Sequence, residues 1–339
     1  MTTPPTLCNL PDVVMRNIFK KVGLNSIINL RKVCRDLRIR IDNIKPEVHL
    51  VSVKIGVDDC KILFQYGRNF GNFGNFGLIY EDDVEYRKAV ESGQTTVRCK
   101  DVEKIVNSDF MEQASRDFLL ILKFQRKSIQ ISFKNTTENS NNFIQFLEML
   151  ESFLSFENQL LKVDKFQIHT KDQKSVMPAL SLTDQQSIHS IAITGWYGEF
   201  QPRIFTEIME MKHWKTAKRF SSTFQITGVS VQNFRHFSQI DVTFELISVE
   251  EVLEFKKIFQ NSTIAHLFEI QYDDSLEDRE QFLEKLGPAF MFRIYFGWYF
   301  RMSTTDDDVL LIQLDDSSNL IIFQREAVAN VRKHAVIQN

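Results

Sequence analysis

Side chains that could carry out chemistry are spread thinly along this chain. Seven histidines are scattered through 339 residues, and none lies in an H-E-x-x-H pattern or at another close metal-ligand spacing. No G-x-S-x-G nucleophile elbow is present either. The cysteines are equally far apart and include no C-x-x-C pair: Cys8, Cys34, Cys60 and Cys99. We therefore expect no catalytic residues, no metal site and no cofactor.

A glycine-containing repeat at residues 69–77 is the segment most similar to a phosphate-binding loop. It consists of three copies of Asn-Phe-Gly, which end at Gly71, Gly74 and Gly77. This spacing differs from the dinucleotide fingerprint, and no Lys-Ser or Lys-Thr follows, as a Walker loop requires. The acidic residues 81–83 follow instead and would repel phosphate. We expect a flexible hairpin tip whose phenylalanines could contact a partner.

The composition is that of a densely packed globular protein. Hydrophobic residues make up 43% of the chain, and 30 of its residues are phenylalanine. A net charge of −3 gives no general electrostatic reason to bind nucleic acid. No apolar run approaches the roughly 18 residues needed to span a bilayer, and the first residues lack the features of a secretory signal. Together with the separated cysteines, this favours an intracellular, reduced protein, cytoplasmic and/or nuclear.

A short amphipathic helical hairpin is predicted near the start of the chain. Its first helix begins at Pro11, a residue favoured in a first turn, and Asp12 suits the positive end of the helix dipole. Gly23 is expected to end this helix. Apolar residues recur along it at helical spacing: Val14, Ile18 and Val22.

The second helix of the hairpin is expected to begin near residues 25–26 and to end before Pro46. Its apolar stripe consists of Leu30, Val33, Cys34, Leu37 and Ile41. Basic residues are expected to surround the stripe in solvent: Arg31, Lys32, Arg35, Arg38 and Arg40. We interpret Cys34 as a small buried hydrophobe. A hairpin this small has apolar side chains to spare, which predicts docking onto a partner, or else packing on the main domain of the same chain.

The order of residues in this hairpin resembles the F-box, the module that binds the Skp adaptor of cullin-based ubiquitin ligases. The resemblance covers residues 7–48 and depends on Leu-Pro at 10–11, Ile18 and Val-Cys-Arg at 33–35. Carried over by position, it implies these adaptor-binding residues: Leu10, Pro11, Val14, Ile18, Val22, Leu30, Val33, Cys34 and Leu37. Valine at position 22, where leucine is common, and leucine at 37, where many members have tryptophan, depart from the pattern but keep its apolar character.

The rest of the chain reads as strands and helices. Alternating residues predict a small β-meander connector over 49–104, which contains the Asn-Phe-Gly loop. Helices are expected at 142–156, at 202–220 and after a capping box at 248–251. Strand centres alternate with them: Ile131, Ile168, Ile193, Val242 and Ile270. We predict an α/β fold in which a helical F-box and the connector precede an irregular strand–helix solenoid similar to leucine-rich repeats; a non-repetitive α/β layer is the alternative.

A second resemblance appears at residues 211–218. The sequence Met-Lys-His-Trp-Lys-Thr-Ala-Lys is similar to the Trp-Lys-x-Ala-Lys signature of the FTH domain, which follows an F-box in a large nematode family, the F-box A type. The resemblance implies an FTH domain over 105–325, followed by a C-terminal tail at 326–339. It also implies that this domain is the partner-binding part. Trp214 lies on the apolar face of its helix, so we expect it in the core.

These features predict a substrate-recognition adaptor of an SCF-type ubiquitin ligase, a non-catalytic subunit. The F-box would bind a Skp-type adaptor and through it a cullin, and the FTH body would bind an unidentified target protein. We expect no direct contact with nucleic acid or a membrane. The alternative is a non-degradative scaffold that binds a regulator such as an RNA-binding protein. An uncharacterised hydrolase is a third interpretation, which the missing motifs disfavour.

Overall fold

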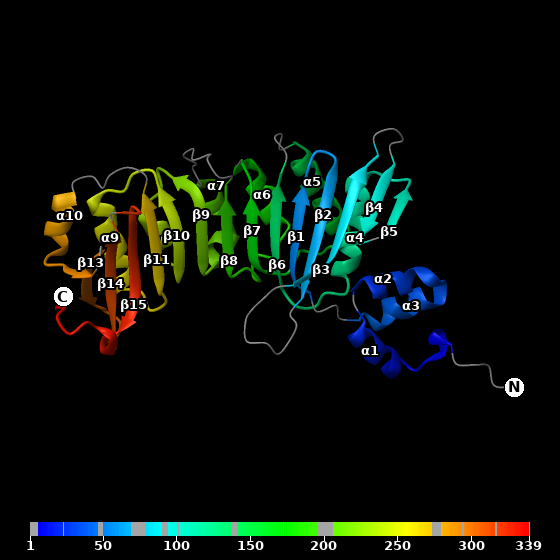
Figure 1. Ribbon diagram of the computed structural model, residues 1–339, viewed down its shortest axis with the longest axis horizontal. Coiled ribbons are helices and arrows are strands. Elements are labelled where there is room, and N and C mark those ends of the chain that lie inside the picture. Colours follow the sequence, from blue (N-terminus) through cyan, green and yellow to red (C-terminus); the bar gives the residue numbers. More distant parts are fainter. Residues whose placement is uncertain are drawn as a thin grey trace. The chain divides into compact units, whose positions relative to one another are not determined.

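The computed structural model describes residues 6–22, 24–46, 50–68, 79–89, 94–100, 102–136, 141–171, 173–195, 206–272, 279–292, 295–315 and 317–338. The chain forms two compact units, Met1–Asp164 with Ser181–Ser187, and Lys165–Leu180 with Ile188–Asn339. Each unit combines helices with β-strands (Figure 1). The predicted helix end at Gly23, the helix start at Pro202 and the repeat at 69–77 lie outside the described residues.

The first unit begins with short helices: η1 (Leu7–Asn9), α1 (Asp12–Lys21), α2 (Leu24–Val33) and α3 (Arg35–Ile44). The predicted second helix is therefore wrong in one respect, because it is broken at Cys34. The backbone of Cys34 is extended, with φ −155° and ψ 165°, and its Sγ accepts a hydrogen bond from the N–H of Leu37 at 3.5 Å. This side chain caps a new helix where periodicity indicated a continuous one.

These helices have an apolar core of their own. Its buried side chains come from α1, α2 and α3: Met15, Phe19, Ile27, Leu37, Ile41 and Ile44. Burying a side chain of this size stabilises the fold by about 1.5–3 kcal/mol. The small module thus holds itself together and still leaves other apolar residues accessible.

The predicted antiparallel meander is present in the first unit. It comprises β1 (Leu50–Val57), β2 (Lys61–Arg68), β3 (Ile79–Lys88), β4 (Thr95–Cys99) and β5 (Val102–Val106). On its other side β1 pairs in parallel with β6 (Ile129–Asn135), so the meander and the following strand form one sheet. Helix α4 (Phe110–Leu122) contacts α5 (Asn141–Phe156) and packs on β2, β3 and β4. The ring of Phe64 in β2 stacks on Phe118 of α4 at 5.2 Å.

The sheet of the second unit changes from parallel to antiparallel. Its parallel part comprises β7 (Val163–His169), β8 (Ser190–Thr194), β9 (Arg219–Ile226), β10 (Gln239–Phe244) and β11 (Leu267–Tyr272). Strand β11 then pairs antiparallel with the final group: β15 (Leu320–Ala327), β14 (Asp308–Asp315), β13 (Tyr295–Arg301) and β12 (Phe290–Phe292). A short β16 (Ile337–Gln338) lies parallel to β13. The protein is therefore mixed α/β, with helices first and sheets after them.

Short helices connect the strands of the second unit: η2 (Gln173–Ser175), α6 (Val176–Ser181), α7 (Thr206–Glu210), α8 (Lys212–Thr216), η3 (Val231–Phe234), α9 (Val249–Gln260), α10 (Arg279–Leu286) and η4 (Val328–Asn330). The capping box is confirmed, with Ser248 and Glu251 bonded reciprocally at the start of α9. The helix expected over 202–220 is present only in part: α7 and α8 lie within this range as two separate helices, and residues from Arg219 onward pair with β8 and β10 as strand β9. Strand–helix alternation fits the predicted repeat, but leucine-rich-repeat-like curvature stays a prediction.

Trp214 is confirmed as a core residue of the second unit. Its side chain is 2% exposed. Three phenylalanine rings surround it edge-on, with centroids 4.6 Å away for Phe220, 4.9 Å for Phe237 and 5.8 Å for Phe234. His236 adjoins the same cluster, and its Nε2 donates to the carbonyl oxygen of Trp214 at 2.8 Å. The Trp-Lys-x-Ala-Lys signature therefore marks an aromatic core.

The partly buried His236 should make folding stability depend on pH. Burial is the largest cause that lowers the pKa of His236, and Lys218 and Arg235 lower it further. The unfolded chain thus binds a proton more readily than the folded one, so stability is lost as pH falls below the unfolded pKa of about 6.5. We expect the melting temperature to fall less in His236→Gln than in the wild type between about pH 7.5 and about pH 5.5.

Differential scanning calorimetry at several pH values measures this difference. The exposed His334 supplies the control, because His334→Gln should keep the wild-type pH dependence. Identical pH profiles for the two variants would contradict the role given to His236.

Candidate functional site

Metal and membrane sites find no support in the described part of the chain. No group of three or more His, Cys, Asp and Glu side chains there could hold a metal ion. Nor is any helix within the described ranges long and apolar enough to cross a membrane. Two candidates are the surface of the N-terminal helices and a cavity in the first unit.

The structure separates the predicted adaptor-binding residues by exposure. Pro11, Val14, Val33 and Cys34 are exposed, Leu10, Ile18, Val22 and Leu30 are half-buried, and Leu37 is buried. At 2% exposure, Leu37 belongs to the core beneath the surface. Val13 is 70% exposed. The set predicted from the sequence does not include it, because it lies outside the helical spacing that starts at Val14. We call six of these exposed or half-buried apolar residues the apolar patch: Leu10, Pro11, Val13, Val14, Ile18 and Val33.

Arg40 holds the segment before α1 in place. Its guanidinium donates to the carbonyl oxygens of Cys8 and Leu10, and its Nη2 lies 2.9 Å from Oδ1 of Asp12. The sequence pattern predicted that this arginine is solvated. The only sequence feature that favoured a link between η1 and α3 is the set of N–H donors on its guanidinium group. Arg31 also has a partner, since it binds the carboxylate of Asp42 through two bonds of 2.7 and 2.9 Å.

Two cysteine side chains meet beside the apolar patch. Sγ of Cys8 lies 3.8 Å from Sγ of Cys34. The prediction that Cys34 is buried is wrong, because its side chain is exposed at the junction of α2 and α3. The contact brings η1 to that junction, so the segment of Leu10 approaches the neighbourhood of Val33.

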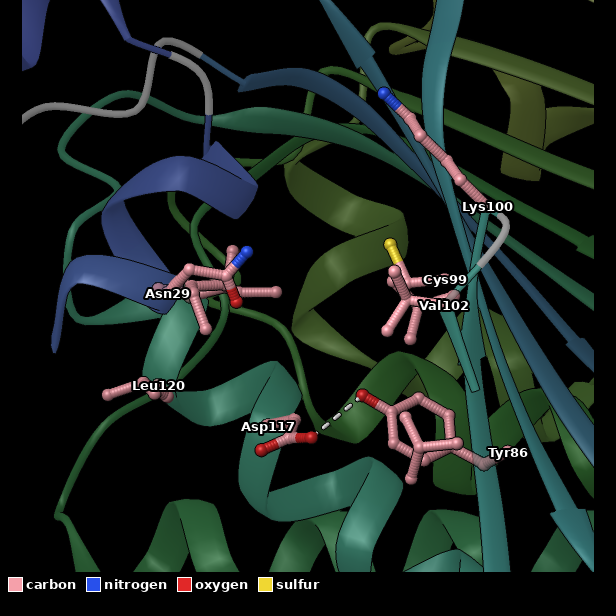
Figure 2. A pocket seen from close by; sticks show the side chains of 11 residues that line it. Asn29, Tyr86, Cys99, Lys100, Val102, Asp117 and Leu120 are labelled. Carbon is pink, nitrogen blue, oxygen red and sulfur yellow. Dashed lines mark hydrogen bonds between the residues drawn. The ribbon is translucent and has the colours of Figure 1, made fainter. Parts of the chain in front are cut away.

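A cavity of about 270 Å³ lies between α2, β3, β4 and α4 of the first unit. Its walls are mainly apolar, and its lining residues are Ile28, Asn29, Val84, Tyr86, Val97, Cys99, Lys100, Val102, Asp117, Leu120 and Ile121. Figure 2 shows Asn29 across the cavity from Cys99 and Val102, which are register partners in β4 and β5. Among the described residues that line this cavity, no histidine accompanies the Cys99 thiol.

A partly buried hydrogen bond forms one wall of this cavity. The hydroxyl of Tyr86 donates to Oδ2 of Asp117 at 3.0 Å (Figure 2). Burial is the largest cause that raises the pKa of Tyr86 well above its ordinary value, and the charge of Asp117 also raises it. The tyrosine therefore stays neutral and remains a donor, which fixes α4 against β3.

Double-mutant analysis can measure this contact. Tyr86→Phe removes the donor of this bond and Asp117→Ala removes its acceptor, so each should destabilise the protein. Combining them should reveal a coupling energy of about 1–3 kcal/mol in urea unfolding. Strict additivity of the two changes would show that the bond contributes nothing.

Two family models match the sequence, and they cover the regions described above. The F-box domain matches residues 7–49, which contain η1 and α1–α3, and the FTH domain matches residues 144–288, from within α5 to just beyond α10. No curated protein matches the chain significantly. F-box domains are in general non-catalytic modules that bind a Skp-type adaptor, and thereby a cullin, in SCF ubiquitin ligases. The chain is therefore an F-box protein that carries an FTH domain.

Proposed function

We propose that this protein is the substrate-recognition adaptor of an SCF-type ubiquitin ligase. Its F-box binds a Skp-type adaptor and through it a cullin, while the FTH-containing body binds a target protein. The observation that carries the proposal is the F-box match over residues 7–49, on helices that keep apolar side chains exposed. Catalysis then belongs to other subunits, and this chain contributes by positioning the target.

The apolar patch can supply the affinity that such a complex needs. Val13 and Val33 are each 70% exposed, and Val14 is 40% exposed. Full burial of a side chain of this kind contributes about 1.5–3 kcal/mol, whereas a micromolar complex requires about 8 kcal/mol net of the cost of association. Several patch residues must therefore be buried together, with a few at the centre contributing most.

Charge around the patch favours an acidic partner surface. Arg16, Arg35 and Arg38 are exposed on α1 and α3. Complementary charges at the rim of an interface mainly accelerate association and make it dependent on salt. An acidic Skp-type surface would thus be guided to the F-box, while burial of the apolar patch would hold it there.

Three members of the predicted set that lie outside the apolar patch have a supporting role in this proposal. Val22 and Leu30 are half-buried, and Leu37 is buried. Their side chains hold the helices in the arrangement that presents Pro11 and Val33. The same proposal includes a leucine-rich-repeat-like body that holds the target. It also places the protein in the cytoplasm and/or the nucleus and in the nematode F-box A type family.

Val33→Asp should abolish or strongly weaken binding to a Skp-type adaptor. The substitution places a carboxylate where the proposal buries a valine, and an unpaired buried charge is costly. We expect the dissociation constant to rise by at least about tenfold to a hundredfold, measured by isothermal titration calorimetry with the purified adaptor.

Val102 supplies a matched control for this experiment. It is also a valine and is also 70% exposed, but it lies on β5, outside the F-box. Val102→Asp should bind the adaptor like the wild type, and thermal unfolding should show both variants folded. Equal affinity of Val33→Asp and the wild type, or failure of the wild type to bind any Skp-type protein, would refute the proposal.

A cellular measurement distinguishes degradation from scaffolding. Proteins that co-purify with the full chain are identified by mass spectrometry, and their abundance is compared in cells that express the wild type or Val33→Asp. We expect a target of the ligase to accumulate in the variant, because the complex no longer reaches the cullin. Unchanged abundance, with complex formation retained, would instead support the non-degradative scaffold.

A further inference from the structure

We propose that Cys8 and Cys34 form a reversible disulfide when the protein encounters a hydroperoxide. Their Sγ atoms lie 3.8 Å apart although the residues are separated by 26 positions in sequence. A disulfide requires about 2.05 Å, so each sulfur must move by roughly 1 Å, which small side-chain rotations can provide. The two elements that carry them, η1 and the α2–α3 junction, therefore already stand in position for a cross-link.

Both sulfurs are accessible to a small oxidant. The side chain of Cys34 is exposed and that of Cys8 is half-buried, and both are free thiols. The other two cysteines lie on different elements, with Cys60 in the turn between β1 and β2 and Cys99 in β4. They therefore serve as internal controls for thiols that are accessible but not placed against this pair.

The chemistry balances with one peroxide for each disulfide. The exposed Cys34 attacks the peroxide as a thiolate, its sulfur takes one oxygen to become a sulfenic acid, and the remainder of the peroxide leaves as an alcohol or water. The sulfur of Cys8 then attacks that sulfur, the new S–S bond replaces the S–O bond, and water leaves. Two thiols thus lose two electrons and two protons, and the O–O bond is reduced. A thiol reductant reverses the change by thiol–disulfide exchange.

Local contacts favour reaction between these two partners. The two sulfur atoms are already in hydrogen-bond contact at 3.8 Å. Arg40 donates a hydrogen bond to the carbonyl oxygen of Cys8, which restrains η1 and keeps the Cys8 thiol close to Cys34. The attacking sulfur is thereby held at the site where the sulfenic acid forms.

The cross-link would join two segments that carry the apolar patch. Cys34 follows Val33 directly, and Cys8 precedes Leu10 by two positions. In the reduced protein the sulfur of Cys34 also accepts the N–H of Leu37 at the start of α3. Oxidation therefore adds a covalent link between η1 and the α2–α3 junction and alters the sulfur that caps α3, whether or not a Skp-type adaptor is the partner.

Mass spectrometry of the oxidised full chain tests the proposal. The purified protein is treated with hydrogen peroxide, alkylated and digested with trypsin without reduction. We expect the peptide Val33–Arg35 linked to the N-terminal peptide that contains Cys8, with at least about tenfold more of this link than of any link to Cys60 or Cys99. Dithiothreitol should release it.

Variants keep the test decisive. The double variant Cys60→Ser and Cys99→Ser should form the same link at the wild-type rate, and Cys8→Ser should instead accumulate a sulfenic acid on Cys34 that dimedone traps. Circular dichroism checks that each variant is folded. Links scattered evenly among the four cysteines, or separate sulfinic acids at positions 8 and 34 with no link, would overturn the proposal.

Discussion

The guanidinium of Arg40 imposes the constraint on which the F-box surface depends. Residues 7–10 form only a single 3₁₀ turn and one extended residue, so the carbonyl oxygens of Cys8 and Leu10 lack the partners that a longer helix would give them. Arg40 satisfies both of them and reaches the carboxylate of Asp12. Asp12 is 63% exposed, so that ion pair adds little stability. What the arginine contributes is position: it ties the Leu-Pro segment to α3.

From this tie the rest of the surface follows. With η1 fixed beside the α2–α3 junction, Cys8 meets Cys34, and the start of α1 is directed by the same contacts. The inner side of α1 is then filled by Met15 and Phe19, both nearly inaccessible to solvent. Its outer side keeps Val13 and Val14 in solvent, where a partner can reach them. The module therefore has apolar side chains of two kinds, those that form its core and those that stay exposed to solvent.

The sequence predicts the existence of these helices better than it predicts which face is inside. On α1, residues 14, 18 and 22 and residues 15 and 19 obey the same helical spacing, and the two stripes differ by only about 100° around the axis. Periodicity alone chose the first stripe, while the structure buries Met15 and Phe19. The F-box resemblance also pointed to the stripe of residues 14, 18 and 22, which is the more exposed one. A family motif includes both docking residues and core residues and does not distinguish them. Leu37 illustrates the mixture, since it carries the motif and yet lies in the core.

Other differences between sequence and structure come from weak or distant interactions. The break at Cys34 depends on a thiol accepting a backbone N–H, a weak bond that few sequence patterns signal. The loss of a helix after Ala217 depends on pairing of β9 with β8 and β10, which are distant in sequence. By contrast, strands with strict alternation, such as β10, and the capping box of α9 are determined locally and were predictable.

The distribution of aromatic residues separates the body from the F-box in how each can bind a partner. Most of the described phenylalanines are buried, including Phe64, Phe118 and Phe146 around one cluster of the first unit. A body that uses its large aromatic side chains in its core has few of them left as anchors for a target. Its most exposed apolar strand residues include Val102 and Ile105, on β5, where the meander of the first unit ends. If this body binds the proposed target, we expect polar contacts and backbone edges to contribute more than aromatic anchors, whereas the proposed adaptor contact of the F-box uses apolar burial.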